Sequence, residues 1–317
     1  MAMMVLAIDI GGTKLAAGIV DAGGDILARD EVPTLATEGP GRVLERIVRL
    51  AKALLATPGV AADTIHRIGI GCAGPVDRHA GLVLNPPNLP GWVRVSLVEY
   101  LEKALGRPAV LENDANAAAL GEFRYGAGRG ARSLVYLTVS TGIGGGIILD
   151  GKIWHGLQDG AGEVGHMTLV PDGPVCGCGN RGCLEALASG PSIARRAREA
   201  LGTGRPSRLR EIRDITAADV VRLAQEGDAV AALVWNETVG YLGLGVAAVI
   251  TILAPERVVI GGGVARAGDP LFEPLRREVR RRVTLVAVES VPILPAALGR
   301  DVGILGAAAV ALEAEPI

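Results

Sequence analysis

The chain has 317 residues, of which 49% are hydrophobic, and its 32 lysine and arginine residues nearly balance 34 aspartate and glutamate residues. This length and apolar content exclude a small stapled domain and a disordered chain, and they predict two domains of ordinary size. The formal net charge of −2 argues against the basic surface that nucleic-acid binding requires, so we expect no nucleic-acid partner.

Targeting signals are not apparent in the sequence. The N-terminal run MAMMVLAIDIGG has no basic flank, and Asp9 interrupts it too early for a signal peptide. Eighteen uncharged residues lie between Glu237 and Glu256, which is close to membrane-spanning length, but several glycines and Pro255 favour a buried core helix. We therefore expect no membrane partner and a cytoplasmic location, where cysteines serve more often as metal ligands than in disulfides.

The first predicted elements are strands joined by glycine turns. Residues 5–20 read as strand, Gly-rich turn and strand, and a second turn at 21–24 leads to another strand that ends near Val32. Apolar residues at helical spacing predict a helix over 41–56, and a short apolar strand follows over 65–71.

The next predicted helix, over 97–105, begins with a capping box of Ser96 and Glu99. A strand over 108–111 then runs into the polar tripeptide Glu-Asn-Asp, which is followed by an Ala-rich helix.

The opening pattern returns in the middle of the chain. Residues 134–149 are again strand, Gly-rich turn and strand, which suggests an internal duplication. The remaining predicted elements are helices over 193–201, 217–225, 229–253, from about 270 and over 302–312, and strands over 257–260 and 291–294. Alternating strands and helices predict an α/β protein, and two matching openings predict two α/β domains with a cleft between them.

Three glycine turns are candidate anion sites, because glycine lets backbone N–H groups approach an anion closely. They are Gly11–Lys14, which adds a hydroxyl and a cation, Ser140–Gly146, which adds two hydroxyls, and Gly261–Gly263. Two such turns on opposite domains would grip a polyphosphate, although either one alone could be a tight hairpin turn. No Walker-type motif is present.

These motifs resemble those of the ROK family, which contains repressors, open reading frames and sugar kinases. The resemblance rests on Asp9–Lys14, on Thr141–Gly146, and on the residues Gly162–His166, Cys176–Cys178 and Cys183–Glu185. The cysteine-containing set is its most specific part, and the markers span essentially the whole chain. The run from Asn113 to Glu122 is most similar to the bacterial glucokinase (hexokinase) branch.

The resemblance implies the two-domain fold of actin and hexokinase, a ribonuclease H-like ATPase fold with duplicated βββαβαβα-type halves and an interdomain cleft. It implies a small domain over 1–115, completed by 299–317, and a large domain over 116–298. ATP would lie in the cleft, with its phosphates at the first two glycine turns and its adenosine near the third, and Mg²⁺ would be held with the help of Asp9. The implied nucleotide and magnesium residues are Asp9, Gly11, Gly12, Thr13, Lys14, Thr141, Gly142, Gly144, Gly145, Gly262 and Gly263.

Phosphoryl transfer to a hydroxyl needs a base that accepts its proton. Asp114 lies at a strand end before the Ala-rich helix, a position that by itself indicates an N-cap. Resemblance to the family's Asn-Asp pair implies instead a general base toward the 6-hydroxyl of a hexose. The sugar would be bound by Ala73, Gly74, Asn88, Asn113, Asp114, Glu163, His166 and Glu185, each implied by the resemblance.

The cysteine-rich segment supplies four candidate metal ligands, His166, Cys176, Cys178 and Cys183. Three sulfur ligands and one nitrogen ligand fit a closed tetrahedral zinc site of the structural kind, and free buried thiols or a disulfide are the alternatives. One ring nitrogen of His166 would bind zinc, and the other could donate to a sugar oxygen. Cys72 has no partner in this scheme and is predicted to be an ordinary buried residue.

The resemblance implies phosphorylation of glucose to glucose 6-phosphate with ATP and Mg²⁺, the first step of glycolysis. The alternatives are a kinase for fructose, mannose or an N-acetylhexosamine, polyphosphate as the donor, and a sugar-responsive repressor. Repressors of the family carry an N-terminal helix-turn-helix module, whereas the first strand here is predicted to start near Val5. Family members often form homodimers or homotetramers, so we expect at least a dimer.

Overall fold

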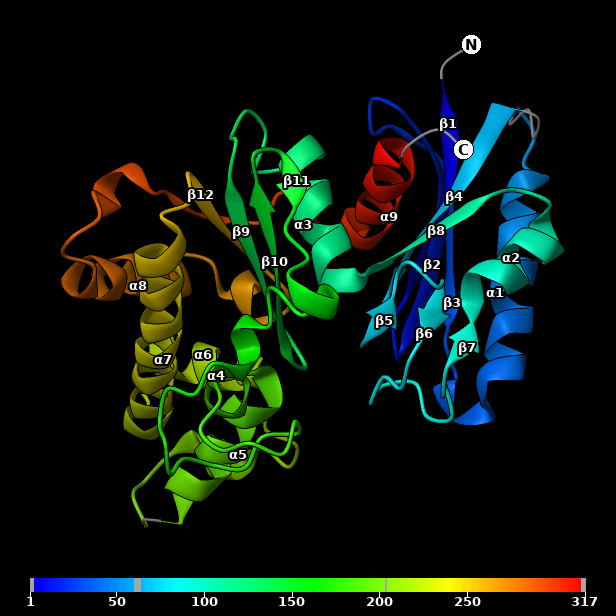
Figure 1. Cartoon of the computed structure of the whole chain (residues 1–317). Coiled ribbons are helices and arrows are strands. Elements are labelled where there is room, and N and C mark those ends of the chain that lie inside the picture. Colours follow the sequence, from blue (N-terminus) through cyan, green and yellow to red (C-terminus); the bar gives the residue numbers. More distant parts are fainter. Residues whose placement is uncertain (1–2, 60–63, 203, 315–317) are drawn as a thin grey trace. The chain divides into compact units, whose positions relative to one another are not determined.

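The computed structural model describes residues 3–59, 64–202 and 204–314, and the chain divides into two compact units (Figure 1). The first unit contains Met1–Gly130, Gly146–Ala161 and Ala297–Ile317, and the second contains Ala131–Gly145 and Gly162–Ala296.

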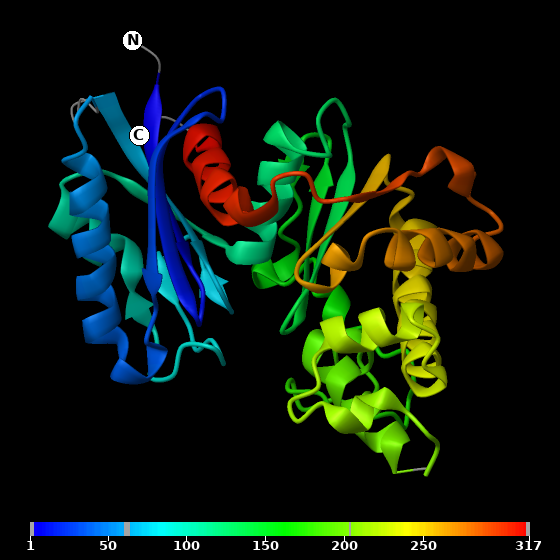
Figure 2. The ribbon, with the colours of Figure 1, turned by 180° about the vertical axis from the view of Figure 1, so that it is seen from behind.

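These units differ in extent from the predicted domains over 1–115 with 299–317 and over 116–298. Helix α3 (Asp114–Tyr125) lies in the first unit because it packs along α9 (Val302–Glu313), and the two helices lie side by side in Figure 2. Their backbones approach closely, since a Cβ at Gly121 would lie 2.9 Å from the backbone nitrogen of Gly306. Helix packing of this kind decides which residues belong to a compact unit, and it cannot be inferred from the spacing of residues along the sequence.

The first unit is built on a five-stranded sheet. Its strands are β1 (Met4–Ile10), β2 (Lys14–Asp21), β3 (Ile26–Pro33), β4 (Ile65–Cys72) and β8 (Ala109–Asn113). Their order is β3-β2-β1-β4-β8, in which β1 is antiparallel to β2 and parallel to β4, and β4 is parallel to β8.

Strand β1 is buried on both faces of this sheet. Successive side chains of a strand point to opposite faces, so Leu6 and Ile8 join the core that contains the apolar side of α1 (Pro40–Leu55), whereas Val5 and Ala7 pack with α9. Burial on both faces explains why this strand reads as a nearly continuous apolar run.

A second, three-stranded sheet in this unit contains β5 (Val76–Asp77), β6 (Leu82–Val83) and β7 (Val95–Ser96). Ser96 precedes α2 (Leu97–Leu105) as predicted, but its side chain makes no capping hydrogen bond, so the predicted capping box with Glu99 is wrong. The reason is that Ser96 also ends β7 and pairs there with Leu82. The resulting ψ of 74° departs from the extended backbone that directs a capping side chain at the helix.

The other five-stranded sheet contains β9 (Leu134–Val139), β10 (Ile143–Leu149), β11 (Lys152–Ile153), β12 (Arg257–Gly261) and β13 (Ile293–Pro295). Its order is β11-β10-β9-β12-β13, with β12 parallel to both β9 and β13, and the chain passes from the second unit to the first within β10. Both large sheets therefore have the order third, second, first, fourth, fifth strand, as the predicted internal duplication requires.

The helices of the second unit are α4 (Leu184–Ala188), α5 (Gly190–Leu201), α6 (Ala217–Gln225), α7 (Ala229–Leu253) and α8 (Asp269–Arg282). Within the described part of the chain, α7 is the one helix long and apolar enough to cross a membrane by length and composition. It packs against α4, α5, α6 and α8, and half of its most apolar window is buried, as expected for the predicted core helix.

Candidate functional site

The turn from β8 into α3, which we call the base turn, consists of Asn113 and Asp114. Asn113 is the N-cap, because its Oδ1 accepts hydrogen bonds from the backbone nitrogens of Ala115 (2.9 Å) and Asn116 (3.2 Å). Asp114 is therefore the first helical residue rather than the cap, and its Oδ1 also accepts from the nitrogen of Ala115 at 2.9 Å. The N-terminal N–H groups of α3 favour a negative charge at this position.

The amide of Asn113 also ties the base turn to the loop after β4. Its Nδ2 donates to the carbonyl oxygen of Gly74 at 3.2 Å. Gly74 has a φ of +90°, and a Cβ there would lie 2.1 Å from the Cβ of Pro86. Pro86 and Asn88 both belong to the loop between β6 and β7, and Asn88 packs against Gly12 of the first glycine turn, where a Cβ would come within 2.7 Å of the Asn88 carbonyl oxygen. The structure thus brings these predicted sugar and phosphate residues of the first unit together.

Asp9 lies at the end of β1 and faces the first turn of α9. A Cβ at Gly303 would lie 2.2 Å from its Oδ2, so a glycine is needed where the carboxyl group meets this helix end. The pKa of Asp9 is raised from 3.8 to about 7, chiefly by burial and then by the charge of Asp114, while Lys14 opposes the shift. A carboxyl oxygen is a hard donor of the kind that Mg²⁺ prefers, so Asp9 has the chemistry that its predicted role toward this cation requires.

The first glycine turn is held from behind by Thr34, which is buried. Its hydroxyl donates to the carbonyl oxygen of Gly11 at 2.6 Å, and its backbone nitrogen donates to the carbonyl oxygen of Thr13 at 2.9 Å. The nitrogen of Gly11 closes the turn by donating to the carbonyl oxygen of Lys14 at 3.0 Å. The ammonium group of Lys14 lies 3.5 Å from Glu31 and is partly exposed.

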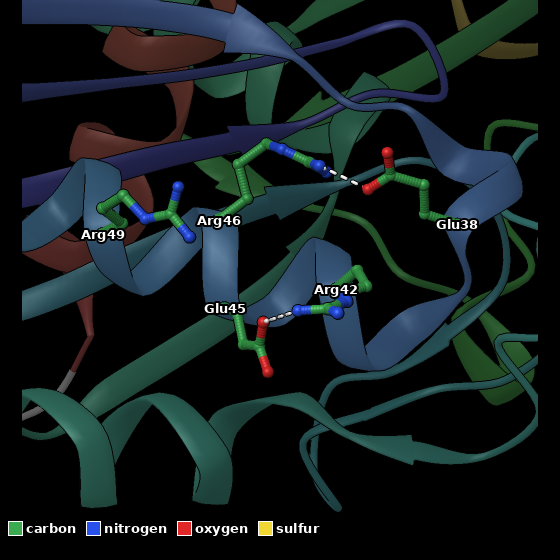
Figure 3. A pocket seen from close by; sticks show the side chains of 5 residues that line it. All are labelled: Glu38, Arg42, Glu45, Arg46 and Arg49. Carbon is green, nitrogen blue, oxygen red and sulfur yellow. Dashed lines mark hydrogen bonds and ion pairs between the residues drawn. The ribbon is translucent and has the colours of Figure 1, made fainter.

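Arg46 on α1 supports Thr34 in turn. One guanidinium nitrogen donates to the carbonyl oxygen of Thr34 at 2.6 Å. Another donates to Glu38 at 2.5 Å, and Figure 3 shows this second interaction. The surface hollow in that view has a volume of about 510 Å³ and is lined by Glu38, Arg42, Glu45, Arg46 and Arg49. Two of these arginines are paired with the two glutamates, and among the residues that line the hollow it is Arg46 that supports the glycine turn, through Thr34.

In the second unit, the second and third glycine turns are neighbours. They follow β9 and β12, which are parallel, and ligands of α/β sheets bind at the carboxyl ends of such strands. Gly262 has a φ of +88°, and a Cβ there would lie 2.4 Å from the carbonyl oxygen of Val139. Ser140 lies beside Gly263, and Thr141 is exposed, so both turns present polar groups at one edge.

Two predicted phosphate residues, Gly144 and Gly145, lie within β10 rather than in the turn. Gly145 is buried, and a Cβ there would come within 2.8 Å of the carbonyl oxygen of Gly162. Its observed role is to let the segment that carries Glu163 pack on the strand; a role toward phosphate stays a prediction.

The cysteine cluster consists of His166, Cys176, Cys178 and Cys183, whose ligand atoms all lie within 4.8 Å of one another. A tetrahedral zinc ion with Zn–S bonds of about 2.3 Å and a Zn–N bond of about 2.05 Å requires separations of about 3.8 Å between sulfurs and about 3.6 Å between sulfur and nitrogen. The sulfurs of Cys178 and Cys183 are 3.8 Å apart, and the Cys176 sulfur is 3.6 Å from His166 Nδ1. The donor set therefore fits zinc in chemistry and in size.

The protonation state of these three cysteines depends on their burial and on the charges and hydrogen-bond donors around each sulfur. Burial raises the pKa of Cys176 to about 12, whereas a backbone N–H of Asn180 lowers the pKa of Cys178. A bound dication would favour the thiolate form of all three cysteines.

The predicted sugar residues of the second unit surround this cluster. His166 directs Nδ1 at the cysteines, and its Nε2 lies 3.8 Å from a carboxyl oxygen of Glu163. Glu185 accepts a hydrogen bond from the nitrogen of Ile143 at 2.9 Å and lies 3.7 Å from the Cys176 sulfur. Glu185 thus links the second glycine turn to the cluster through Cys176, and Glu163 lies beside the histidine of the same cluster.

Sequence reasoning missed four supporting residues, Thr34, Arg46, Glu112 and His155. Glu112 is buried directly before the base turn, and its Oε2 lies 2.7 Å from His155 Nε2. A glutamate at the end of a strand was the only local signal, because its partner lies 43 positions along the chain.

The ROK family pattern matches residues 5–314 of this chain. The glucokinase of Thermotoga maritima is 39% identical over 316 residues and 98% of both chains, and an N-acetylmannosamine kinase of Citrobacter koseri is 37% identical over 310 residues, 98% of this chain and 99% of that protein.

Solved structures show the same similarity. A ROK hexokinase from Thermus thermophilus superposes with a TM-score of 0.85 at 41% identity and covers 98% of both chains. A ROK family glucokinase from Streptomyces griseus, in complex with glucose and AMPPNP, superposes with a TM-score of 0.82 at 34% identity, over 98% of this chain and 100% of that one. These likenesses confirm the predicted α/β fold of the hexokinase type.

Proposed function

Because this chain belongs to the ROK family, as its motifs predicted, we propose that it is an ATP-dependent sugar kinase that phosphorylates the 6-hydroxyl of glucose. The single observation that carries the proposal is the base turn, in which Asn113 takes the cap and Asp114 presents a carboxylate at the start of α3. Relatives named glucokinases and the glucose complex of the Streptomyces griseus protein support the choice of sugar and donor.

Asp114 acts as the general base in this proposal. Its carboxylate accepts the proton of the 6-hydroxyl as that oxygen attacks the terminal phosphate of ATP. The side-chain oxygen of Asn113 accepts hydrogen bonds from two backbone nitrogens, and one of its amide hydrogens is donated to the carbonyl oxygen of Gly74. The second amide N–H therefore remains to donate to a sugar hydroxyl. The amide orients the turn and the sugar at the same time.

ATP is assigned to the glycine turns. Gly11, Gly12 and Thr13 would bind phosphate through backbone N–H groups, with the cation of Lys14 beside them, and Thr141 and Gly142 would do the same from the second unit. Gly262 and Gly263 would lie by the adenosine. Mg²⁺, held with the help of Asp9, supplies positive charge to the phosphate oxygens when it is bound.

The cysteine cluster is proposed to hold a structural zinc ion through His166, Cys176, Cys178 and Cys183. All four positions would be filled by protein, so the metal would take no part in the chemistry. Its proposed task is to fix Glu163, His166 and Glu185 as hydrogen-bond partners of glucose. The sulfur and nitrogen separations described above support this assignment.

A second candidate substrate is an N-acetylhexosamine, because the Citrobacter koseri relative is an N-acetylmannosamine kinase at 37% identity. The chemistry at Asp114 would be the same. The site must then accept an acetamido group at the second carbon, and a pocket built to bond a hydroxyl there discriminates by roughly 10⁴-fold.

The deciding experiment measures ADP release by the purified protein with glucose, fructose, mannose, N-acetylglucosamine and N-acetylmannosamine, each with ATP or polyphosphate. The proposal expects the highest kcat/KM for glucose with ATP. A higher value for any other sugar would replace glucose as the substrate, and inactivity toward every sugar would refute the kinase assignment.

We also propose that the chain forms at least a homodimer and acts in the cytoplasm. One supporting feature of assembly is the outer side of α7, where Leu233, Leu244 and Ile252 are exposed. Light scattering after size exclusion tests the assembly, and fractionation of the producing cell tests the location.

A further inference from the structure

A buried carboxylate lies directly before the base turn. Glu112 is the penultimate residue of β8 and is 4% exposed. Its Oε1 accepts hydrogen bonds from the backbone nitrogen of Asn113 at 2.9 Å and from Nδ2 of Asn116 at 3.1 Å, and its Oε2 lies 2.7 Å from His155 Nε2. Burial of a charge is costly without such partners, so Glu112 connects the end of β8, the first turn of α3 and the segment after β11.

His155 must donate in this pair. A carboxylate only accepts hydrogen bonds, so Nε2 of His155 carries the proton that faces Glu112. The backbone holds the histidine in place, since its carbonyl oxygen accepts from the nitrogen of Ala161 at 2.9 Å and the nitrogen of Trp154 donates to the carbonyl oxygen of Ile147 at 2.8 Å. Glu112 is therefore anchored to a segment that does not belong to β8 or α3.

The carboxylate of Glu112 also fixes the orientation of the Asn116 side-chain amide. It is 2% exposed, and its backbone nitrogen donates to the capping oxygen of Asn113. Its side-chain nitrogen faces Glu112, and its Oδ1 has no hydrogen-bond partner within the described residues. A reversed amide would direct that oxygen at the carboxylate. Nδ2 of Asn116 thus keeps its hydrogen bond to Glu112, although this leaves the buried Oδ1 of Asn116 without a donor among the described residues, at a free-energy cost of about 1–3 kcal/mol.

We propose that Glu112 and His155 are a positioning pair that fixes the base turn and so sets the orientation of Asp114. This inference rests on the proposed role of Asp114 as the base. The pair acts through Asn113 and Asn116, the two residues whose hydrogen bonds define the first turn of α3. Displacing a reacting group by about 1 Å can lower a rate about 100-fold, so such a pair affects turnover without touching the sugar.

A double-mutant cycle on kcat tests the pair. Glu112→Ala and His155→Ala should each lower kcat about 10- to 100-fold, with a smaller change in the KM for glucose. The double variant should be no slower than the slower single variant, because both substitutions disrupt the same hydrogen-bonded pair. Losses that multiply in the double variant would show that the two residues act separately and would overturn the proposal.

Two rescue experiments distinguish lost positioning from a damaged fold. His155→Gln keeps an N–H donor and should recover most of the kcat that His155→Ala loses. Glu112 and His155 both line a cavity of about 780 Å³ in the first unit, so added imidazole should reach Glu112 and raise the kcat of His155→Ala. Failure of both rescues would reject the hydrogen bond as the cause.

The matched control is Asp228→Asn. Asp228 is a buried carboxylate that caps α7 in the second unit through the nitrogens of Val230 and Ala231. It should lower the melting temperature and leave kcat unchanged. If Glu112→Ala and His155→Ala behave in the same way, the pair is only structural. That result leaves the proposed function intact, whereas full activity of Asp114→Asn would refute the base itself.

Discussion

The base turn and the cysteine cluster both fix the positions of polar side chains, but different interactions stabilise them. Both hold polar side chains that are proposed to face glucose. The base turn joins a buried strand to a helix and is fixed by hydrogen bonds that backbone and amide nitrogens donate to the side-chain oxygens of Asn113 and Glu112. The segment from Glu163 to Cys183 contains one short 3₁₀ helix, Val164–His166, and two isolated β-bridges among its described elements.

The difference shows what regular structure contributes to a site. A strand and a helix each satisfy most of their own backbone groups, so a few side-chain bonds suffice to fix the junction between them. A loop of more than about 15 residues loses much conformational entropy on ordering. A metal ion bound by four of its side chains stabilises one conformation of such a segment. The two regions should therefore respond differently to substitution.

The largest effect is expected at the base turn. Asp114→Asn keeps the shape of the side chain but removes the base, so kcat should fall about 10²- to 10⁴-fold. The dissociation constant for glucose, measured by calorimetry, should change by less than about threefold if Asp114 contributes chiefly to the reaction. Near-wild-type turnover in this variant would remove Asp114 from the mechanism.

The next largest effect is expected at the cysteine cluster. Cys178→Ser should lose zinc, measured by elemental analysis, and should weaken glucose binding about tenfold or more, because Glu163 and His166 lose their support. Cys72→Ser is the matched control and should retain zinc, since Cys72 lies outside the cluster. Zinc loss with unchanged glucose affinity would show that the cluster contributes only to stability.

A smaller effect is expected at Thr34, which supports the first glycine turn through hydrogen bonds, as Asn113 and Glu112 support the base turn. Thr34→Val removes the hydroxyl that donates to Gly11, a bond worth about 1 kcal/mol, so the KM for ATP should rise about fivefold. The KM for glucose should stay the same. Thr216→Val, which removes the cap of α6, is the control and should leave both constants unchanged.

The last prediction concerns stability rather than turnover, as a function of pH in the absence of metal. The pKa of Asp9 is raised from 3.8 to about 7, so the folded state binds more protons than the unfolded state between these values. This contribution to stability is fully present below about pH 4 and is lost as the pH rises through about 7. The melting temperature of the magnesium-free protein should therefore fall more between pH 5 and pH 8 than that of Asp9→Asn. Equal slopes would contradict the shift.

Local pattern predicted most of the elements. Helices over 217–225 and 229–253 have the predicted bounds, because their apolar spacing and polar caps lie within one stretch of sequence. Helix α5 begins at Gly190, three residues before its predicted start, because Ser189 caps it and Pro191 occupies its first turn. The predicted last strand over 291–294 is Ile293–Pro295, since only these residues pair with β12.

The sequence by itself determined the family, the repeated strand–turn–strand openings and the cysteine cluster, since each of the motifs that carry them is a short stretch of consecutive or closely spaced residues. Tertiary structure decided the rest. It assigned the cap to Asn113 rather than Asp114, placed Thr34 behind Gly11, and paired Glu112 with His155. The reason is physical: a buried polar group bonds whichever group the sheet topology brings to it, and the distance between the two along the chain does not enter.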